Sequence, residues 1–304
     1  MISKVDSIQL RGIAIILVLG GHLISAKVIP LASELRYFAS FSVSVFLILS
    51  GYGLVKSYLK SGLDRFFIKR FSSVVLPFII TTIILYAFSY YEKHNLLTLL
   101  KTITFTQFDI IMDGTMWYVY YIVFIYLLFF LVFSIPIHIV GKVILLFLLS
   151  VYVFLFFSDI NLQRMSFQFS LHAFSFAIGS LLAIINLKWH MRVGLLVITL
   201  IGFFYSYSLL IVKYSLFLYM ISAILFGVGS FLFYSLSLFS IRILTFIGTI
   251  SYEIYLLEGF FLWRLFPTTI ELKVSYFFCV TILLAYFLHQ FNSWLQYKMN
   301  SKLH

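Results

Sequence analysis

The sequence predicts an all-α fold, a polytopic transmembrane helical bundle of about ten spans. Of its 304 residues 63% are hydrophobic and only 10% are charged, and the mean hydropathy is +1.10. Soluble domains carry about 25% charged residues, so this chain lacks the polar side chains needed to cover a water-facing surface. The apolar residues form continuous runs. A membrane β-barrel instead requires short segments that alternate apolar and polar residues, so the runs indicate helices.

Ten apolar runs are separated by charged or proline-containing breaks. A helix needs about 20 apolar residues to cross a hydrocarbon core of about 30 Å, and each run is near that length. Pro136 and His138 separate the fourth run from the fifth. The uncharged stretch from Tyr214 to Ile241 is long for one crossing and predicts a tilted helix. We expect the spans near residues 8–26, 37–55, 72–91, 116–135, 139–158, 168–187, 193–211, 215–236, 244–263 and 274–294.

The distribution of charge predicts the topology. The net charge of +11 lies almost entirely in loops, which is expected of loops retained beside anionic lipid and does not call for a nucleic-acid partner. Ten spans place both termini on one side of the membrane. The short loop after the second span carries a basic cluster, which we expect in the cytoplasm together with both termini. The cluster consists of Lys56, Lys60, Arg65, Lys69 and Arg70.

The domain organisation is equally simple. We expect one membrane-embedded domain over residues 1–304, with the longest outer loop, about residues 92–115, as an outer cap. Cys279 is the only cysteine, which excludes an intrachain disulfide and a cysteine-based metal cluster. No His, Asp and Glu set has metal-ligand spacing, so no metal site is predicted.

Ionisable side chains inside the predicted spans are the main functional candidates. A charged residue at mid-membrane costs at least about 2.5 kcal/mol on insertion scales, so each one is expected to have a functional or structural purpose. The candidates are Arg11, His22, His172, Glu253, Glu258 and His289. For His172, a hydrogen bond to a neighbouring helix is the favoured interpretation.

Glu253 and Glu258 are five residues apart, which is about 140° around a helix. Only one of them can therefore face a narrow site, and the spacing does not decide which. The other carboxylate would cap the helix end or pair with Arg264 or Arg242.

Arg11 and His22 form the most informative pair. They are eleven residues apart, a spacing that leaves an offset of about 20° and a rise of roughly 16 Å on an ideal helix. Both side chains therefore share one face, with Arg11 near the cytoplasmic entrance and His22 near mid-membrane. An imidazole there can act as a base or nucleophile, and a guanidinium can bind phosphate. The structural alternative is a snorkelling arginine and a histidine bonded to another helix.

Five segments in order resemble the acyltransferase family 3 membrane proteins. The Arg-x10-His spacing of Arg11 and His22 matches the hallmark of that family's first helix. The other matches are a Phe- and Ser-Gly-containing stretch, a basic loop running to Pro77, a Trp-aromatic helix start and a late Gly-x-x-Ser-Tyr motif. They are found at residues 46–52, 66–77, 114–118 and 248–256.

The sequence departs from the family pattern at two positions. Where relatives often have Arg-x-x-Arg, Arg70 is followed by Ser73, so a second cation must come from Lys69 or Arg65 or be absent. Where many relatives have a late histidine, Glu258 is found.

The resemblance implies transfer of an acyl group, usually acetyl from acetyl-CoA, to a hydroxyl of a cell-surface glycan or lipid-linked sugar. Acyl-CoA is then the donor substrate, held by Arg11 with Lys69 and Arg70, and His22 is the catalytic base or a transient acyl carrier. The side chains that could donate to the oxyanion or line the substrate site are Ser50, Tyr52, Trp117, Tyr118, Glu253 and Glu258. For the first four of these, simple packing or an interfacial position is the competing interpretation.

The resemblance also implies a multi-pass protein of a bacterial plasma membrane, in contact with membrane lipids. One alternative is a transporter or exporter of a glycan or small metabolite, which would favour Gly/Pro-interrupted helices in symmetric pairs. The four prolines show no such symmetry. A catalytically inactive relative is the other alternative, which Ser73 and Glu258 leave open.

Overall fold

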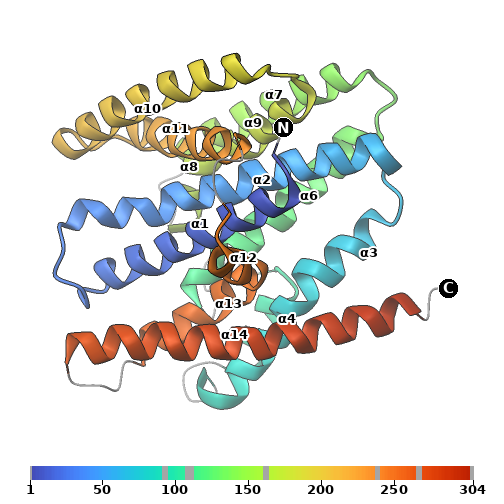
Figure 1. Ribbon diagram of the computed structural model, residues 1–304. Helices are drawn as coiled ribbons and strands as arrows, with labels where there is room; N and C mark the ends of the chain where they lie inside the picture. Colours follow the sequence, from blue (N-terminus) through green and yellow to red (C-terminus); the bar gives the residue numbers. More distant parts are fainter. Residues whose placement is uncertain are drawn as a thin grey trace. The chain divides into compact units, whose positions relative to one another are not determined.

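The computed structural model describes residues 2–90, 95–106, 113–159, 164–236, 240–264 and 269–301, which are helices and short connections without a β-strand (Figure 1). The α-helices are α1 (Lys4–Ser25), α2 (Tyr37–Ser61), α3 (Phe66–Arg70), α4 (Leu76–Leu85), α5 (Leu96–Ile103), α6 (Trp117–Ser134), α7 (Ile139–Asp159), α8 (Arg164–His172), α9 (Ser175–Ile184), α10 (Trp189–Val212), α11 (Leu216–Ser235), α12 (Arg242–Thr249), α13 (Ser251–Leu262) and α14 (Ile270–Ser301). The short helical segments are η1 (Ser33–Arg36), η2 (Phe71–Val75), η3 (Tyr86–Tyr90) and η4 (Gly114–Met116).

The polytopic helical bundle is confirmed. Within the described ranges, nine helical segments are long and apolar enough to cross a membrane. The pair α12 and α13 passes the same test only when its two helices are taken together, which gives up to ten spans. The chain is thus a multi-pass membrane protein, and its spans fall where the apolar runs predict them.

The chain divides into two compact units, and each is described by itself. The first unit comprises Met1–Ser25, Pro30–Asp64 and Ile125–Thr249. The second comprises Ala26–Ile29, Arg65–Phe124 and Ile250–His304. Helix α6 contributes its first half to the second unit and its remainder to the first.

Glycines bring helices of the first unit into close contact. Helix α2 packs along α9, and α1 along α12. A Cβ atom added at Gly179 of α9 would collide with the carbonyl of Ile48 in α2, and one added at Gly248 of α12 would collide with the carbonyl of Ile8 in α1. Membrane helices associate through such small residues because lipid provides no hydrophobic driving force.

Gly179→Val is expected to destabilise the protein by about 1–3 kcal/mol, because the added side chain would push α9 away from α2. The control is Gly194→Val in α10, since a Cβ at Gly194 meets no atom within 4 Å. Thermal unfolding of both variants in detergent tests this expectation. Equal melting temperatures for the two variants would mean that the α2–α9 contact is not tight.

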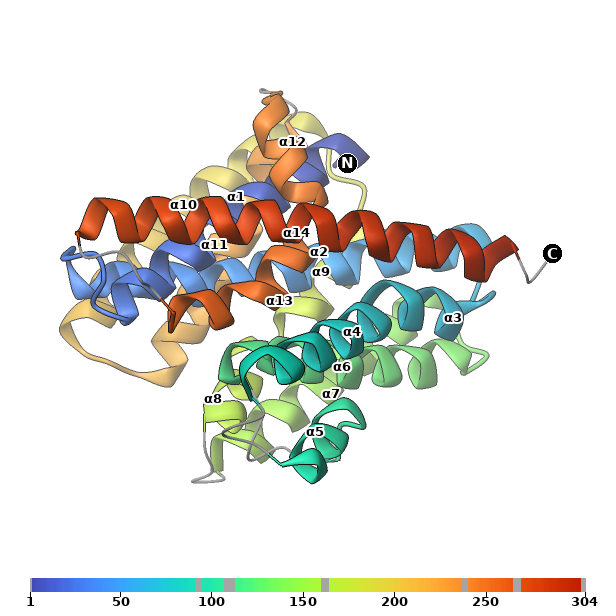
Figure 2. The same ribbon diagram turned by 90° about the horizontal axis from the view of Figure 1, so that it is seen from below.

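The second unit contains α3, η2, α4, α5, α13 and α14. Helices α13 and α14 lie side by side (Figure 2). Helix α5 lies in the stretch predicted to be an outer loop, so that prediction was incomplete. Its N-cap is Asn95, whose side chain accepts a hydrogen bond of 2.8 Å from the Thr98 N–H. Residues 91–94 and 107–112 of the same stretch are outside the described residues.

Candidate functional site

Helix α1 carries Arg11 and His22 without interruption from Lys4 to Ser25. Arg11 is exposed and His22 is half-buried. The rise of roughly 16 Å between them is too large for one small molecule to contact both, whereas an extended ligand can. A Cβ atom added at Gly21, next to His22, would collide with Ala39 and crowd the carbonyl of Arg36, so this end of α1 lies close to the start of α2 in the first unit.

Ser50 and Tyr52 lie in α2 of the same unit, and both are half-buried. The ring of Tyr52 makes an edge contact with Phe231 at a centroid distance of 5.1 Å. The Lys56 ammonium lies 5.7 Å from the centre of the same ring. These contacts give Tyr52 a packing function within the unit, the alternative that the sequence left open.

His172 is fully buried and forms an interhelical polar contact, as expected. Its Nδ1 lies 3.0 Å from Oγ of Ser44 in α2. Ser175 of α9 donates to the same Ser44 oxygen at 3.0 Å. The cluster joins α2, α8 and α9 and gives buried polar groups their partners.

Trp117 and Tyr118 begin α6, in the second unit, after a turn that Asp113 organises. The Asp113 carboxylate accepts from the backbone N–H and the hydroxyl of Thr115, at 2.9 and 2.7 Å. Trp117 is buried and Tyr118 is half-buried. The turn therefore sets the direction in which both aromatic side chains enter the unit.

Tyr255 of α13 links this turn to the late Ser-Tyr motif. The Tyr118 backbone N–H donates to the Tyr255 hydroxyl at 3.1 Å, and that hydroxyl donates to the Thr115 carbonyl. Gly259, one turn further along α13, leaves room for Asp113 and Thr115, since a Cβ there would collide with both side chains. Asp113 and Tyr255 were not among the predicted site residues, although Tyr255 lies within the motif at residues 248–256 and Asp113 directly precedes the one at 114–118.

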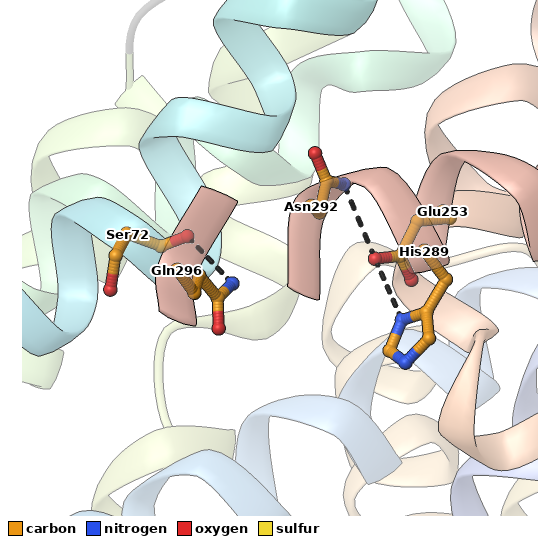
Figure 3. Close-up of polar contacts among 5 residues, drawn as sticks. All are labelled: Ser72, Glu253, His289, Asn292 and Gln296. Atoms are coloured by element: carbon orange, nitrogen blue, oxygen red, sulfur yellow. Dashed lines mark hydrogen bonds and ion pairs between the residues drawn. The ribbon is translucent and has the colours of Figure 1, made fainter. Parts of the chain in front are cut away.

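The two carboxylates of α13 have different surroundings, as their spacing predicted. Glu258 is fully buried and interacts electrostatically with Tyr255. Glu253 faces α14, where its Oε1 lies 3.0 Å from Nδ1 of His289 and 3.4 Å from Nδ2 of Asn292 (Figure 3). For Glu253 the partner is His289, which was not among the predicted partners Arg264 and Arg242. Such polar partners lower the cost of burying a carboxylate.

Lys69 and Arg70 end α3 and directly precede η2, a π-helical turn from Phe71 to Val75. Lys69 is exposed and Arg70 is half-buried. Ser73, the residue that replaces the expected second arginine, donates through its hydroxyl to the Lys69 carbonyl at 2.7 Å. The Ser73 side chain therefore forms a local hydrogen bond with the backbone of the preceding turn.

An apolar cavity of about 650 Å³ lies between α4, α13 and α14 of the second unit. Arg264 is the charged residue of its lining, and its guanidinium stacks on Phe260 at 4.1 Å. The remaining lining residues are Thr81, Ile84, Leu85, Phe88, Leu257, Phe260, Phe261, Leu284, Phe287, Leu288 and Phe291. Apart from the Arg264 guanidinium and the Thr81 hydroxyl, the lining is apolar.

The predicted site residues are divided between the units. Arg11, His22, Ser50 and Tyr52 belong to the first unit. The second unit brings together three polar groupings: Lys69 and Arg70 with the π turn, Trp117 and Tyr118 with Asp113 and Tyr255, and Glu253 with His289 and Asn292.

Comparison with known families agrees with the resemblance of the motifs. No curated protein and no solved structure is significantly similar to the chain. A family model described as an acyltransferase domain matches residues 5–295. Because this match covers nearly the whole chain and includes all the motifs above, the protein belongs to acyltransferase family 3.

Proposed function

We propose that this membrane protein is an O-acyltransferase that moves an acyl group, in the first place acetyl, from acyl-CoA to a hydroxyl of a cell-surface glycan or lipid-linked sugar. Membership of an acyltransferase family supports acyl transfer in general. The observation that carries the proposal is the placement of Arg11 and His22 on one uninterrupted membrane helix. A cation and a proton acceptor at such a separation suit a long donor with phosphates at one end and a thioester at the other.

In this proposal the donor is bound by cationic side chains. The Arg11 guanidinium and the basic segment at Lys69 and Arg70 would pair with the phosphates of CoA, because guanidinium and ammonium groups donate charge-assisted hydrogen bonds to phosphate oxygens. Both termini and the basic cluster would lie in the cytoplasm of a bacterium, where acyl-CoA is made, and the protein would lie in the plasma membrane.

The chemistry at His22 takes one of two forms. As a base, the imidazole accepts the proton of the acceptor hydroxyl while the oxygen attacks the thioester carbonyl; the C–S bond then breaks and the proton passes to the thiolate of CoA. As a carrier, an imidazole nitrogen attacks the carbonyl, CoA leaves as the thiol, and the acceptor hydroxyl then takes the acyl group from nitrogen. Either route gives the ester and free CoA.

The oxyanion of the tetrahedral intermediate needs hydrogen-bond donors. Ser50 and Tyr52, in the same unit as His22, remain candidates for this function, as do Trp117 and Tyr118. Glu253 and Glu258 remain candidates for the substrate site. Glu258 would act as an acid or base in place of the histidine found in many relatives.

Two measurements test the proposed function. The O-acetyl content of cell-surface glycans is compared between cells with and without the gene, and we expect loss of one O-acetyl class without the gene. Purified protein supplied with labelled acetyl-CoA should then transfer label to the glycan identified in that comparison. If surface glycans are unchanged and no acceptor becomes labelled, the proposed acceptor class is wrong.

A further inference from the structure

In the π turn η2, the carbonyl of Ser72 does not receive the hydrogen bond that an α-helix would give it. The Leu76 N–H, which would pair with the Ser72 carbonyl in an α-helix, donates to the Phe71 carbonyl. The next residue, Pro77, has no N–H. A backbone carbonyl left without a helical donor needs another hydrogen-bond partner when it is shielded from water.

Two side chains supply hydrogen bonds to this turn. Nε2 of Gln296 in α14 donates to the Ser72 carbonyl at 2.9 Å (Figure 3). The hydroxyl of Tyr252 in α13 donates to the Val74 carbonyl at 2.7 Å. Helices α13 and α14 thus each donate one hydrogen bond to the five-residue turn η2.

The grouping of Glu253, His289 and Asn292 fastens α14 to α13 beside these bonds. His289, Asn292 and Gln296 follow the i, i+3, i+7 pattern and so lie on one face of α14. Glu253 follows Tyr252 directly, and its carboxylate contacts both His289 and Asn292. Asn292 is buried, and its Oδ1 has no hydrogen-bond partner among the described residues. The face of α14 that reaches Ser72 is therefore the one bound to Glu253.

The π turn decides where the preceding cations point. A π turn holds about one residue more than an α turn, so it rotates the segment before it by about 100° compared with a continuous α-helix. Lys69 and Arg70 are the last two residues before the turn. Loss of the bonds from Gln296 and Tyr252 would free the turn to change, and the two cations would then move.

We propose that Gln296 and Tyr252 are positioning residues that hold the π turn so that Lys69 and Arg70 face the phosphates of the donor. The inference rests on the proposed function, because it takes CoA as the ligand of the two cations. In this inference the function of α13 and α14 is to orient the phosphate-binding segment, which lies in the same unit.

The test measures the dissociation constants of CoA and of pantetheine, which lacks the nucleotide phosphates, for the full-length protein in lipid nanodiscs. Tyr252→Phe and Gln296→Ala each remove one donor. We expect each to raise the Kd for CoA about two- to tenfold, the range of a lost neutral hydrogen bond, and to leave the Kd for pantetheine unchanged. The matched controls are Tyr297→Phe and Gln290→Ala, which change exposed residues of α14 and should affect neither ligand.

A double-mutant cycle sharpens the result. With Lys69 and Arg70 both changed to alanine, Tyr252→Phe and Gln296→Ala should have no further effect on CoA binding, because the groups that they position are gone. Unchanged CoA binding in either single variant overturns the inference while leaving the proposed donor intact, and so does an equal loss for CoA and pantetheine. If the wild-type protein binds CoA no better than pantetheine, the donor assignment is wrong, and the inference is overturned with it.

Discussion

His22→Ala is expected to lower the rate of acyl transfer from acyl-CoA by about 100- to 10,000-fold, the range of a lost general base. In the proposed mechanism the His22 imidazole accepts the proton of the acceptor hydroxyl, and alanine cannot take over this function. Membrane insertion should be unaffected, since alanine is tolerated in any span. The measurement is the initial rate of label transfer by purified protein at saturating donor and acceptor.

The matched control for this prediction is His190→Ala. His190 is exposed at the start of α10, in the same unit as His22, and its loss should leave the rate unchanged. Full turnover by the His22→Ala variant would remove His22 from the chemistry and with it both forms of the proposed mechanism.

Purified wild-type protein can distinguish the two proposed functions of His22, general base and transient acyl carrier. If His22 carries the acyl group, incubation with labelled acetyl-CoA without acceptor should leave label on the protein and release an equivalent of CoA. If His22 is a base, neither occurs until the acceptor is added. The His22→Ala variant provides the blank for both measurements.

Arg11→Ala is expected to raise the KM for acyl-CoA by about 10- to 100-fold, because a charge-assisted hydrogen bond contributes about 1.5–3 kcal/mol. The effect on kcat at saturating donor should be much smaller, since the guanidinium lies roughly 16 Å along α1 from His22. The KM of Arg11→Lys for acyl-CoA should lie between those of the wild-type protein and Arg11→Ala, because lysine keeps the charge and loses the planar pair of donors.

Acetyl-pantetheine provides the critical comparison for Arg11. If Arg11 binds the phosphates of the donor, the variant should use acetyl-pantetheine as well as the wild-type protein does. A fall in kcat equal for both donors would instead place Arg11 at the reacting thioester. Lys213→Ala, which removes an exposed cation at the end of α10, is the control for net charge.

The sequence was sufficient for the class of fold and for the family. Twenty-residue apolar runs have few alternatives to membrane helices, because every backbone polar group in lipid must be bonded within its own segment. The spacing of Arg11 and His22, read with four other motifs, identified the family that the comparison then showed. Helix α5 was missed because it is short and lies in a stretch without a full apolar run.

Polar contacts between distant segments could not be predicted in the same way. Glu253 and His289 are separated by 36 residues, and Gln296 and Ser72 by 224. Sequence periodicity gives the face of a helix on which a side chain lies, and it does not give the neighbour of that face. The pairing of Glu253 therefore had to be left open between several cations.

The sequence by itself determined that this protein is a multi-pass helical membrane protein of an acyltransferase family, because length and hydropathy of each segment act locally. Only the tertiary structure decided that a proline-containing helix adopts a π turn beside its cations and that Tyr252 and Gln296 serve its carbonyls. The physical reason is that a buried polar group takes its partner from whichever helix packs against it, and that choice is made when the helices assemble.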